Sequence, residues 1–445
     1  MKNTDVTTTD IASSDQPDAG RRKLTKQVIG ALAGATVLAG APYVRAQNKI
    51  KLTYWSRDYN HGSAVTYAQE FMKANPRYDI SVEGLPFTGM WEKVNTALLG
   101  GKAADIFSAV LSWVPALAEL DLIHPIDNLW MRDVSASDRA DYFATGIDSV
   151  TYKNRFYGMP WRVDGNIMLW SMDAFREAGL DPMKAPDTWN ELATYAGKLV
   201  TNRGGVQQQG IGWAGKPLDL LVQWYFYPIL WSNGGDVTDD KVQRSLLDSK
   251  ASVDAFTFLT DLNRKQKAAT PEVFNLAWSD LSPLLAKRSI AMALGHQANI
   301  DSVMKVTPGM KLAAGPFPSG PAGRFSNGTG WCHLIAKTAK LDEAWPFLQY
   351  LQDPARQAVL TVGAPGRKAG LSHPKYDVLR QDPALKYAVT SGSDTARSHP
   401  LAKNPKSTEV AREIGVALSE AWQGKLSPAD AAQLAHRKVG EMLKA

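Results

Sequence analysis

Strand-like and helix-like segments alternate through the first part of the chain, and this alternation restricts the fold more than any other feature. Alternating apolar residues predict strands at 50–55, 78–83 and 104–110. One helix is predicted to end at Asn75-Pro76, and a second to run from about residue 89 to 100. Strands connected through helices are parallel, so the sequence predicts an open α/β sheet flanked by helices.

The carboxyl ends of these strands are where we expect a ligand. Ligands of open α/β sheets bind beyond the carboxyl ends of the strands. Polar and aromatic side chains follow the first strand at 55–61 and the third strand at 108–113. Both loops are therefore expected to face one crevice.

Length and charge limit the class of protein. A chain of 445 residues is too long for one ordinary core, so at least two domains are expected. With 44% hydrophobic and 21% charged residues the chain is globular in composition. Its net charge of +6 is not gathered into a basic block, which argues against nucleic acid as a partner.

Cys332 is the one cysteine in the sequence. It cannot form an internal disulfide, and no metal site can be built from cysteine spacing. We predict that Cys332 is a small buried side chain. A nucleophilic pair with His333 is disfavoured, because neighbouring residues of a strand point to opposite faces.

Residues 1–46 have the pattern of an export signal. Arg21-Arg22 and Lys26 precede an apolar stretch at 28–41, and 44–46 offers small residues for cleavage before Gln47. The arginine pair favours a twin-arginine signal, and a Sec signal is the alternative. No cysteine directly follows Leu38-Ala39-Gly40 at the end of the apolar stretch, so we expect the mature protein to be soluble in the periplasm without a lipid anchor.

The segment 154–192 is predicted to contain a strand at 156–161, a lone acid at Asp164 and a second strand at 166–171. Pro160 favours an edge or crossover position, because proline cannot donate to a central ladder. A helix is predicted to begin near Asp187 or Thr188, with Glu191 completing a capping box.

Further motifs follow in a recognisable order. They lie at 101–106, where Ala104 replaces a usual proline, and at 120–127, 231–236, 286–292, 295–298, 328–331 and 342–351. Together with 154–192, this series resembles the family 1 extracellular solute-binding proteins over nearly all of residues 49–445. These proteins are the sugar-binding subunits of bacterial ABC importers.

The resemblance implies two α/β lobes, each an open sheet flanked by helices, joined by three hinge crossings as in class II periplasmic binding proteins. The crossings are expected near 158–163, 313–317 and 363–368. The N-terminal lobe would then contain 48–158 plus 318–363, and the C-terminal lobe 159–317 plus 364–445. Glycine- and proline-rich segments at 315–321 and 363–366 fall at two of these crossings.

A sugar site needs aromatic rings for the C–H faces of each pyranose and polar side chains for its hydroxyl groups. We expect these groups at the strand ends, the crossings and the glycine turns. The predicted ligand-binding residues are Trp55, Arg57, Asp58, Ser108, Ser112, Trp113, Asp164, Trp224, Trp231, Gln297, Trp331 and Arg367. Four other tryptophans, Trp170, Trp189, Trp278 and Trp345, are predicted to be core or helix-capping residues.

The resemblance implies a monomeric, non-enzymatic binding subunit that takes a sugar or oligosaccharide to the permease of an ABC importer, without cofactor or metal. A ligand such as glycerol phosphate or another polyol is the alternative, and arginines near the predicted cleft leave room for an anion. A secreted glycoside hydrolase using Asp58 and Asp164 is a more distant alternative, because such an enzyme needs one acid of raised pKa in an apolar pocket.

Overall fold

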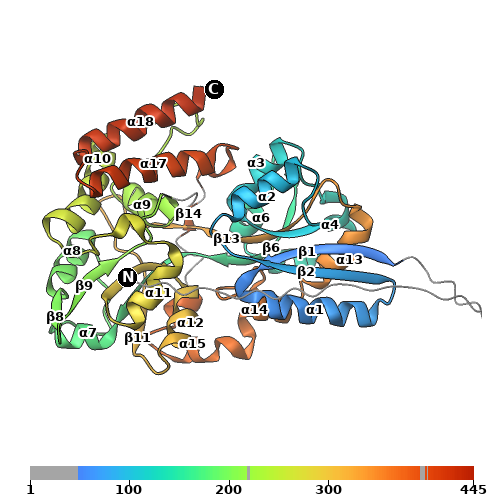
Figure 1. The fold of residues 1–445 in the computed structure, drawn as a ribbon, viewed down its shortest axis with the longest axis horizontal. Helices are drawn as coiled ribbons and strands as arrows, with labels where there is room; N and C mark the ends of the chain where they lie inside the picture. The colour runs from blue at the N-terminus through green and yellow to red at the C-terminus, as the bar shows by residue number, and fades with distance from the viewer. Residues whose placement is uncertain (1–48, 218–220, 391–395, 398, 445) are drawn as a thin grey trace, which may run out of the picture. The chain divides into compact units, whose positions relative to one another are not determined.

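The structure is a computed structural model that describes residues 49–217, 221–390, 396–397 and 399–444 (Figure 1). The predicted export signal at 1–46 and its cleavage before Gln47 lie outside these residues. In the described part of the chain, no helix has the length and apolar character needed to cross a membrane.

The first sheet has the strand order β2-β1-β3-β13-β6. Its strands are β1 (Ile50–Arg57), β2 (Tyr78–Leu85), β3 (Ile106–Val110), β6 (Gly158–Asp164) and β13 (Thr329–Ile335). Strand β1 is parallel to β2 and β3, whereas β13 is antiparallel to β3 and β6. The predicted parallel α/β opening is confirmed, and β6 with Pro160 lies at the edge of the sheet, as predicted.

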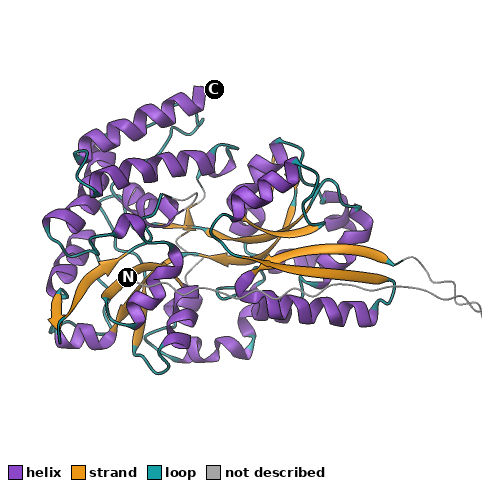
Figure 2. Ribbon diagram, viewed as in Figure 1, coloured by secondary structure: helices purple, strands orange, loops and turns teal. Residues whose placement is uncertain are grey.

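Helices flank this sheet (Figures 1 and 2). They include α1 (His61–Ala74), α2 (Met90–Leu99), α3 (Val114–Glu119), α13 (Leu341–Tyr350) and α14 (Pro354–Leu360). Helix α1 ends at Asn75, whose N–H donates to Phe71 O, and Pro76 follows as predicted. Large aromatic side chains such as Tyr54 and Phe107 are fully buried between the sheet and its helices.

The second sheet has the strand order β11-β7-β10-β9-β8. Its strands are β7 (Asn166–Ser171), β8 (Thr201–Arg203), β9 (Val206–Gly212), β10 (Ile290–His296) and β11 (Leu312–Gly315). Around it lie α7 (Met172–Glu177), α8 (Trp189–Lys198), α9 (Leu221–Ser232), α10 (Lys250–Thr260), α11 (Trp278–Ala286), α12 (Gln297–Val306), α17 (Ser407–Trp422) and α18 (Pro428–Lys444). Helix α9 is apolar on almost every side because it lies inside this core rather than on a surface.

The chain passes between the two sheets three times. Only Gly165 separates β6 of the first sheet from β7 of the second. The chain returns between β11 and β13, and it leaves the first core again between Leu360 and Tyr376. The exact lobe limits, 48–158 plus 318–363 and 159–317 plus 364–445, stay predictions.

Two local predictions are confirmed in atomic detail. Helix α8 begins after Thr188, whose hydroxyl accepts the Glu191 N–H at 3.1 Å, while the Glu191 carboxylate accepts the Asp187 N–H at 2.7 Å. Cys332 is fully buried in β13, and this burial raises the pKa of its thiol. His333 contacts Tyr54 and Gln352, with 2.8 Å from Nε2 to the Tyr54 hydroxyl, so it has structural partners.

Candidate functional site

A pocket between the two sheets gathers residues that are far apart in the sequence. We call it the cleft pocket, and its lining residues are Arg57, Tyr59, Phe87, Arg162, Asp164, Trp224, Trp278, His296 and Trp331. Its empty space, open solvent at the mouth included, is about 390 Å³. An adjoining hollow of about 710 Å³, measured in the same way, shares four of these residues and adds Asp58.

Both sheets contribute to the cleft pocket through the ends of their strands and the segments that follow. Arg57 ends β1, Asp164 ends β6 and His296 ends β10. Trp224 lies in α9, and Trp278 is the first residue of α11. The expectation that the loops at 55–61 and 108–113 face one crevice holds for the first loop, whereas no residue of 108–113 lines the cleft pocket or the adjoining hollow.

The charged centre of the cleft pocket is the ion pair between Arg162 and Asp164. The two residues alternate along β6 and therefore share one face of the strand, where they are 6% and 2% exposed. Asp164 Oδ1 also accepts the Ala364 N–H at 2.9 Å. Burial raises the pKa of the Asp164 carboxyl, and Arg162 and the Ala364 amide act against that rise. Asp164, predicted as a lone acid, is in fact half of a buried pair.

This pair depends on a close approach by the third passage of the chain. A Cβ atom on Gly363 would lie 2.2 Å from Asp164 Oδ1 and 2.8 Å from Arg162 Nε. Only glycine leaves room for the carboxylate at that point. The predicted crossing segment therefore requires glycine at position 363 for steric reasons.

Arg57 is the second cation of the cleft pocket. Its guanidinium lies 4.8 Å from the Trp331 ring centroid, and Nη2 is 3.2 Å from the half-exposed Asp58 carboxylate. Nη1 donates to Leu85 O, but Nε has no hydrogen-bond partner in the described part of the chain. Burial lowers the pKa of Arg57, yet arginine remains charged at physiological pH. A buried N–H donor is therefore available at the pocket.

Aromatic rings make up most of the remaining wall. Phe87 and Trp224 are stacked with centroids 6.1 Å apart, and Trp331 meets Phe87 edge-on at 5.9 Å. His296 lies edge-on to Trp224 at 4.7 Å. Burial lowers the pKa of His296 to about 3, so its imidazole is neutral at physiological pH. The wall thus offers flat apolar surfaces beside an uncharged ring nitrogen.

Five of the predicted site residues lie at the cleft. Arg57, Asp164, Trp224 and Trp331 line the cleft pocket itself, and Asp58 lines the adjoining hollow. The other predicted residues line neither of these two spaces: Trp55, Ser108, Ser112, Trp113, Trp231, Gln297 and Arg367.

The structure corrects the placement of two tryptophans. Trp231 is 1% exposed in the second core, where it stacks on His399 at 5.5 Å and donates to Asp236 at 3.2 Å. It turns inward because α9 is surrounded by other elements. Trp113 is fully buried behind the pocket and packs edge-on against Trp331 at 6.3 Å. Neither ring offers a free face to a ligand.

Four more of the predicted site residues lie outside the cleft pocket and the adjoining hollow. Trp55 is half-buried, with Lys93 Nζ 5.2 Å from its ring centroid. Ser108 is fully buried within β3, and Ser112 follows in the next turn. Gln297 is 3% exposed beside His296, and among the described residues its side-chain amide has no hydrogen-bond partner. The hydroxyl groups of Ser108 and Ser112 likewise have no hydrogen-bond partner among the described residues.

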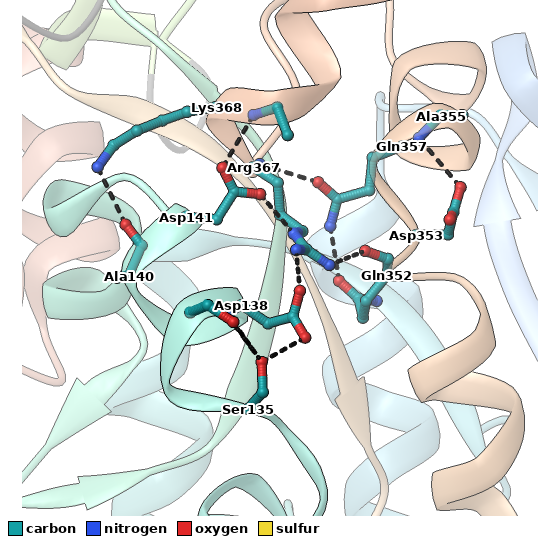
Figure 3. Close-up of polar contacts among 12 residues, drawn as sticks. Ser135, Asp138, Ala140, Asp141, Gln352, Asp353, Ala355, Gln357, Arg367 and Lys368 are labelled. Carbon is teal, nitrogen blue, oxygen red and sulfur yellow. Dashed lines mark hydrogen bonds and ion pairs between the residues drawn. The ribbon is translucent and has the colours of Figure 1, made fainter.

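Arg367 belongs to a separate ion cluster (Figure 3). Its Nε is 2.8 Å from Asp141, its Nη2 pairs with Asp138, and its backbone N–H donates to Gln357 at 3.0 Å. These partners occupy the guanidinium and fix the third passage of the chain to α5 (Ala136–Asp141). Arg367 therefore has a structural role at the third passage, and it lines neither the cleft pocket nor the adjoining hollow, where the ligand contact was expected.

Sequence reasoning missed five lining residues, namely Tyr59, Phe87, Arg162, Trp278 and His296. The alternation of Arg162 with Asp164 could have indicated that both side chains lie on one face of the strand. Trp278, expected to be a core or helix-capping residue, is the first residue of α11 and also lines the cleft pocket. Trp170, Trp189 and Trp345 are buried and donate to protein acceptors. Within the described ranges, no three His, Cys, Asp or Glu side chains are grouped so as to hold a metal ion.

Comparisons with known proteins agree with this architecture. The chain is 24% identical to the sn-glycerol-3-phosphate-binding periplasmic protein UgpB of Escherichia coli K12, with 93% of this chain and 97% of that protein covered. It superposes on the Thermotoga lettingae ABC transporter solute-binding protein bound to α-D-tagatose with a TM-score of 0.78, 23% identity and coverage of 88% and 99%. UgpB of Mycobacterium tuberculosis in complex with glycerophosphocholine gives a TM-score of 0.77, 18% identity and coverage of 89% and 99%.

The structural likenesses establish the two-lobed fold of periplasmic solute-binding proteins. The family model described as "Bacterial extracellular solute-binding protein" matches residues 66–370, which is more than half of the chain. The chain therefore belongs to the family of bacterial extracellular solute-binding proteins.

Proposed function

We propose that the protein captures a sugar or short oligosaccharide in the cleft pocket and delivers it to the permease of an ABC importer. The observation that carries this proposal is the composition of the pocket wall. Five aromatic rings surround one buried Arg162–Asp164 pair, and the lining residues come from both sheets. This is the combination of apolar faces and directed polar groups that a pyranose requires.

Asp164 is well suited to accept sugar hydroxyl groups. A carboxylate has about four acceptor positions, and the contacts to Arg162 and Ala364 use two of them. Charge-assisted hydrogen bonds to a buried carboxylate are short and strong. Trp224, Trp278 and Trp331 would then cover the ring faces of the solute.

The position of the pocket supports transport by lobe closure. A solute that contacts Asp164 at the end of β6 and Trp224 on α9, which packs on the second sheet, stabilises the closed arrangement, because it binds that state more tightly than the open one. The permease would distinguish the loaded protein by the relative position of its two lobes. We expect the binding protein to act as a monomer and without a cofactor.

The same contacts disfavour catalysis by this pocket. Burial raises the pKa of Asp164, which a general acid requires, but its pairing with Arg162 favours the charged form. Asp58, the other carboxylate of the proposed hydrolase pair, is half-exposed and contacts Arg57. A binding protein without enzymatic activity accounts for both carboxylates.

Arg57 favours a second candidate ligand, a polyol that carries an anionic group such as glycerol phosphate. The cleft pocket contains two arginines and one aspartate, and Arg57 Nε has no hydrogen-bond partner among the described residues. A phosphate or carboxylate would use both the excess charge and that donor. The Escherichia coli and Mycobacterium tuberculosis relatives are named for ligands of this chemistry.

The test is a thermal-shift screen of the purified protein against neutral sugars, sugar acids, polyols and glycerol phosphates. A ligand that binds only the folded state raises the melting temperature. Hits are then measured by calorimetry for wild type and two matched variants, Trp224→Ala in the pocket and Trp231→Ala in the core.

We expect Trp224→Ala to weaken binding and Trp231→Ala to lower stability while leaving the affinity unchanged. Equal affinity in wild type and Trp224→Ala would contradict the cleft pocket as the binding site. Recovery of a chemically altered ligand would support the hydrolase instead.

Export to the periplasm is proposed from residues 1–46. Replacement of Arg21-Arg22 by two lysines should block export, because lysine does not reproduce the geometry of the guanidinium pair. Cell fractionation with mass spectrometry of the exported protein gives both the compartment and the first residue, which we expect near Gln47. Undiminished export of the lysine variant would identify a Sec signal.

A further inference from the structure

A second hollow lies on the domain formed around the second sheet. It opens between the middle of β9, the segment after α10 and the end of α17. We call it the basic hollow and define it by Gln207, Gln209, Arg264, Lys267, Trp422 and Lys425. It has a volume of about 1200 Å³ including its mouth, and it shares no lining residue with the cleft pocket.

The basic hollow carries a one-sided charge. Arg264, Lys267 and Lys425 line it, and no carboxylate does. Lys425 pairs with Glu420 at 3.0 Å, whereas no ion pair involves Arg264 or Lys267 within the described ranges. Arg264 Nη1 donates to the Trp422 carbonyl at 2.9 Å, which holds its guanidinium at the hollow. Two cations therefore remain without a protein counter-charge.

Two buried polar groups also lack partners at this place. Gln209 is 7% exposed, and its Oε1 accepts no hydrogen bond from the described residues. Trp422 is 1% exposed, and its indole N–H likewise finds no acceptor there. Buried polar groups are normally paired with protein, water or ligand. One acceptor and one donor are thus left for a bound molecule.

The local backbone departs from regular geometry where it builds the hollow. A π-helical turn at Asp261–Lys265 follows α10 and carries Arg264. Lys267 has a φ of 50°, and Gly424 has a φ of 75°. A Cβ atom on Gly424 would lie 2.5 Å from Arg264 Cζ, so this glycine makes room for the guanidinium. Turns of this kind are frequent at functional sites.

From these observations we infer that the basic hollow is a second binding site, separate from the cleft, for a small hydroxylated anion such as a sugar phosphate or sugar acid. Arg264, Lys267 and the Trp422 N–H would bind the anionic group. Gln207 and Gln209 alternate along β9 and share one face, from which their amides would bind hydroxyl groups.

The experiment is calorimetric titration of the full chain with three probes: glucose 6-phosphate, galacturonate and neutral glucose. The test variant is Arg264→Gln combined with Lys267→Gln. The matched control is Lys265→Gln, because Lys265 lies on the same turn, is exposed and does not line the hollow. Trp224→Ala separates any binding in the cleft from binding in the hollow.

We expect one or both anions to bind wild type, Lys265→Gln and Trp224→Ala alike, and the double variant at least about tenfold more weakly. Tighter binding of glucose 6-phosphate identifies phosphate as the preferred anionic group, and tighter binding of galacturonate identifies carboxylate. Binding should also weaken with salt, because exposed cations are screened.

Three results would overturn the inference: no anion binding by wild type, equal binding by the double variant, or loss of binding in Trp224→Ala. If the double variant does not fold, Lys267→Glu alone provides the same test, since it reverses the charge at one exposed position.

Discussion

Two arginine–aspartate clusters lie along the third passage of the chain, and only one of these two lines the cleft pocket. Arg162 and Asp164 are buried and line the cleft pocket. Arg367 pairs with Asp138 and Asp141 away from the cleft pocket, where the third passage meets α5 (Figure 3). The residue types are the same in both clusters. The position of each cluster decides whether its charged groups can bind a solute or hold the chain in place.

Asp164→Asn should have the largest effect of the changes that separate the two clusters. It leaves the Arg162 charge buried without a counter-ion, which costs about 3–5 kcal/mol of folding free energy. It should also reduce ligand affinity roughly tenfold to a hundredfold, the loss of a charged hydrogen bond of about 1.5–3 kcal/mol. Chemical denaturation and calorimetry measure the two effects. Unchanged affinity in a folded variant would place the ligand elsewhere.

Gly363→Ala should disturb the Arg162–Asp164 cluster without removing a charge. The added methyl group would overlap the Asp164 carboxylate, so we expect a loss of stability of about 1–3 kcal/mol. Affinity should fall as well, because the carboxylate must move. Gly62→Ala is the matched control, since a Cβ atom there meets no heavy atom within 4 Å. Wild-type behaviour of Gly363→Ala would show that the carboxylate is not confined.

Arg367→Gln should lower stability by about 1–2 kcal/mol and leave affinity unchanged. Asp141 is mostly buried but Asp138 is 45% exposed, so solvent screening reduces the value of the second pair. The same two measurements as for Asp164→Asn provide a direct comparison. A tenfold loss of affinity in Arg367→Gln would restore the ligand role that the sequence predicted.

The smallest expected effect is on the pH dependence of stability. The Ser135 hydroxyl, and then Arg367, hold the pKa of Asp138 below its ordinary value. This stabilisation is present above the ordinary aspartate pKa and is lost as the pH falls through the lowered value. The stability difference between wild type and Arg367→Gln should therefore narrow in acid. A constant difference, measured by denaturation between neutral pH and pH 3, would exclude this linkage.

Part of the fold could be predicted from the sequence, because the features that determine it act within short segments. The alternation at 50–110 fixed the parallel strands, since apolar periodicity and helix-ending residues act over a few positions. Pro160 indicated an edge strand because it lacks an N–H, and Thr188 indicated a helix start. Such features are properties of short segments.

The site depended on contacts between segments that only the tertiary structure brings together. Four residues predicted from the sequence line the cleft pocket: Arg57 at a strand end, Asp164 beside a crossing, Trp331 at a glycine turn and Trp224 in the second lobe. It could not separate Trp224 from Trp231, which lie on one helix but face the cleft and the core.

The two arginine clusters show the same limit. Arg162 and Arg367 both lie beside glycine-rich or crossing segments, and nothing local distinguishes them. Their roles differ because Arg162 meets Asp164 on a strand face that lines the cleft pocket, whereas Arg367 pairs with two carboxylates from α5. Residue type and strand position were determined by the sequence alone. Which side chains line the cleft was decided by how elements distant in the sequence pack against each other. The same packing determines which polar groups still lack a hydrogen-bond partner.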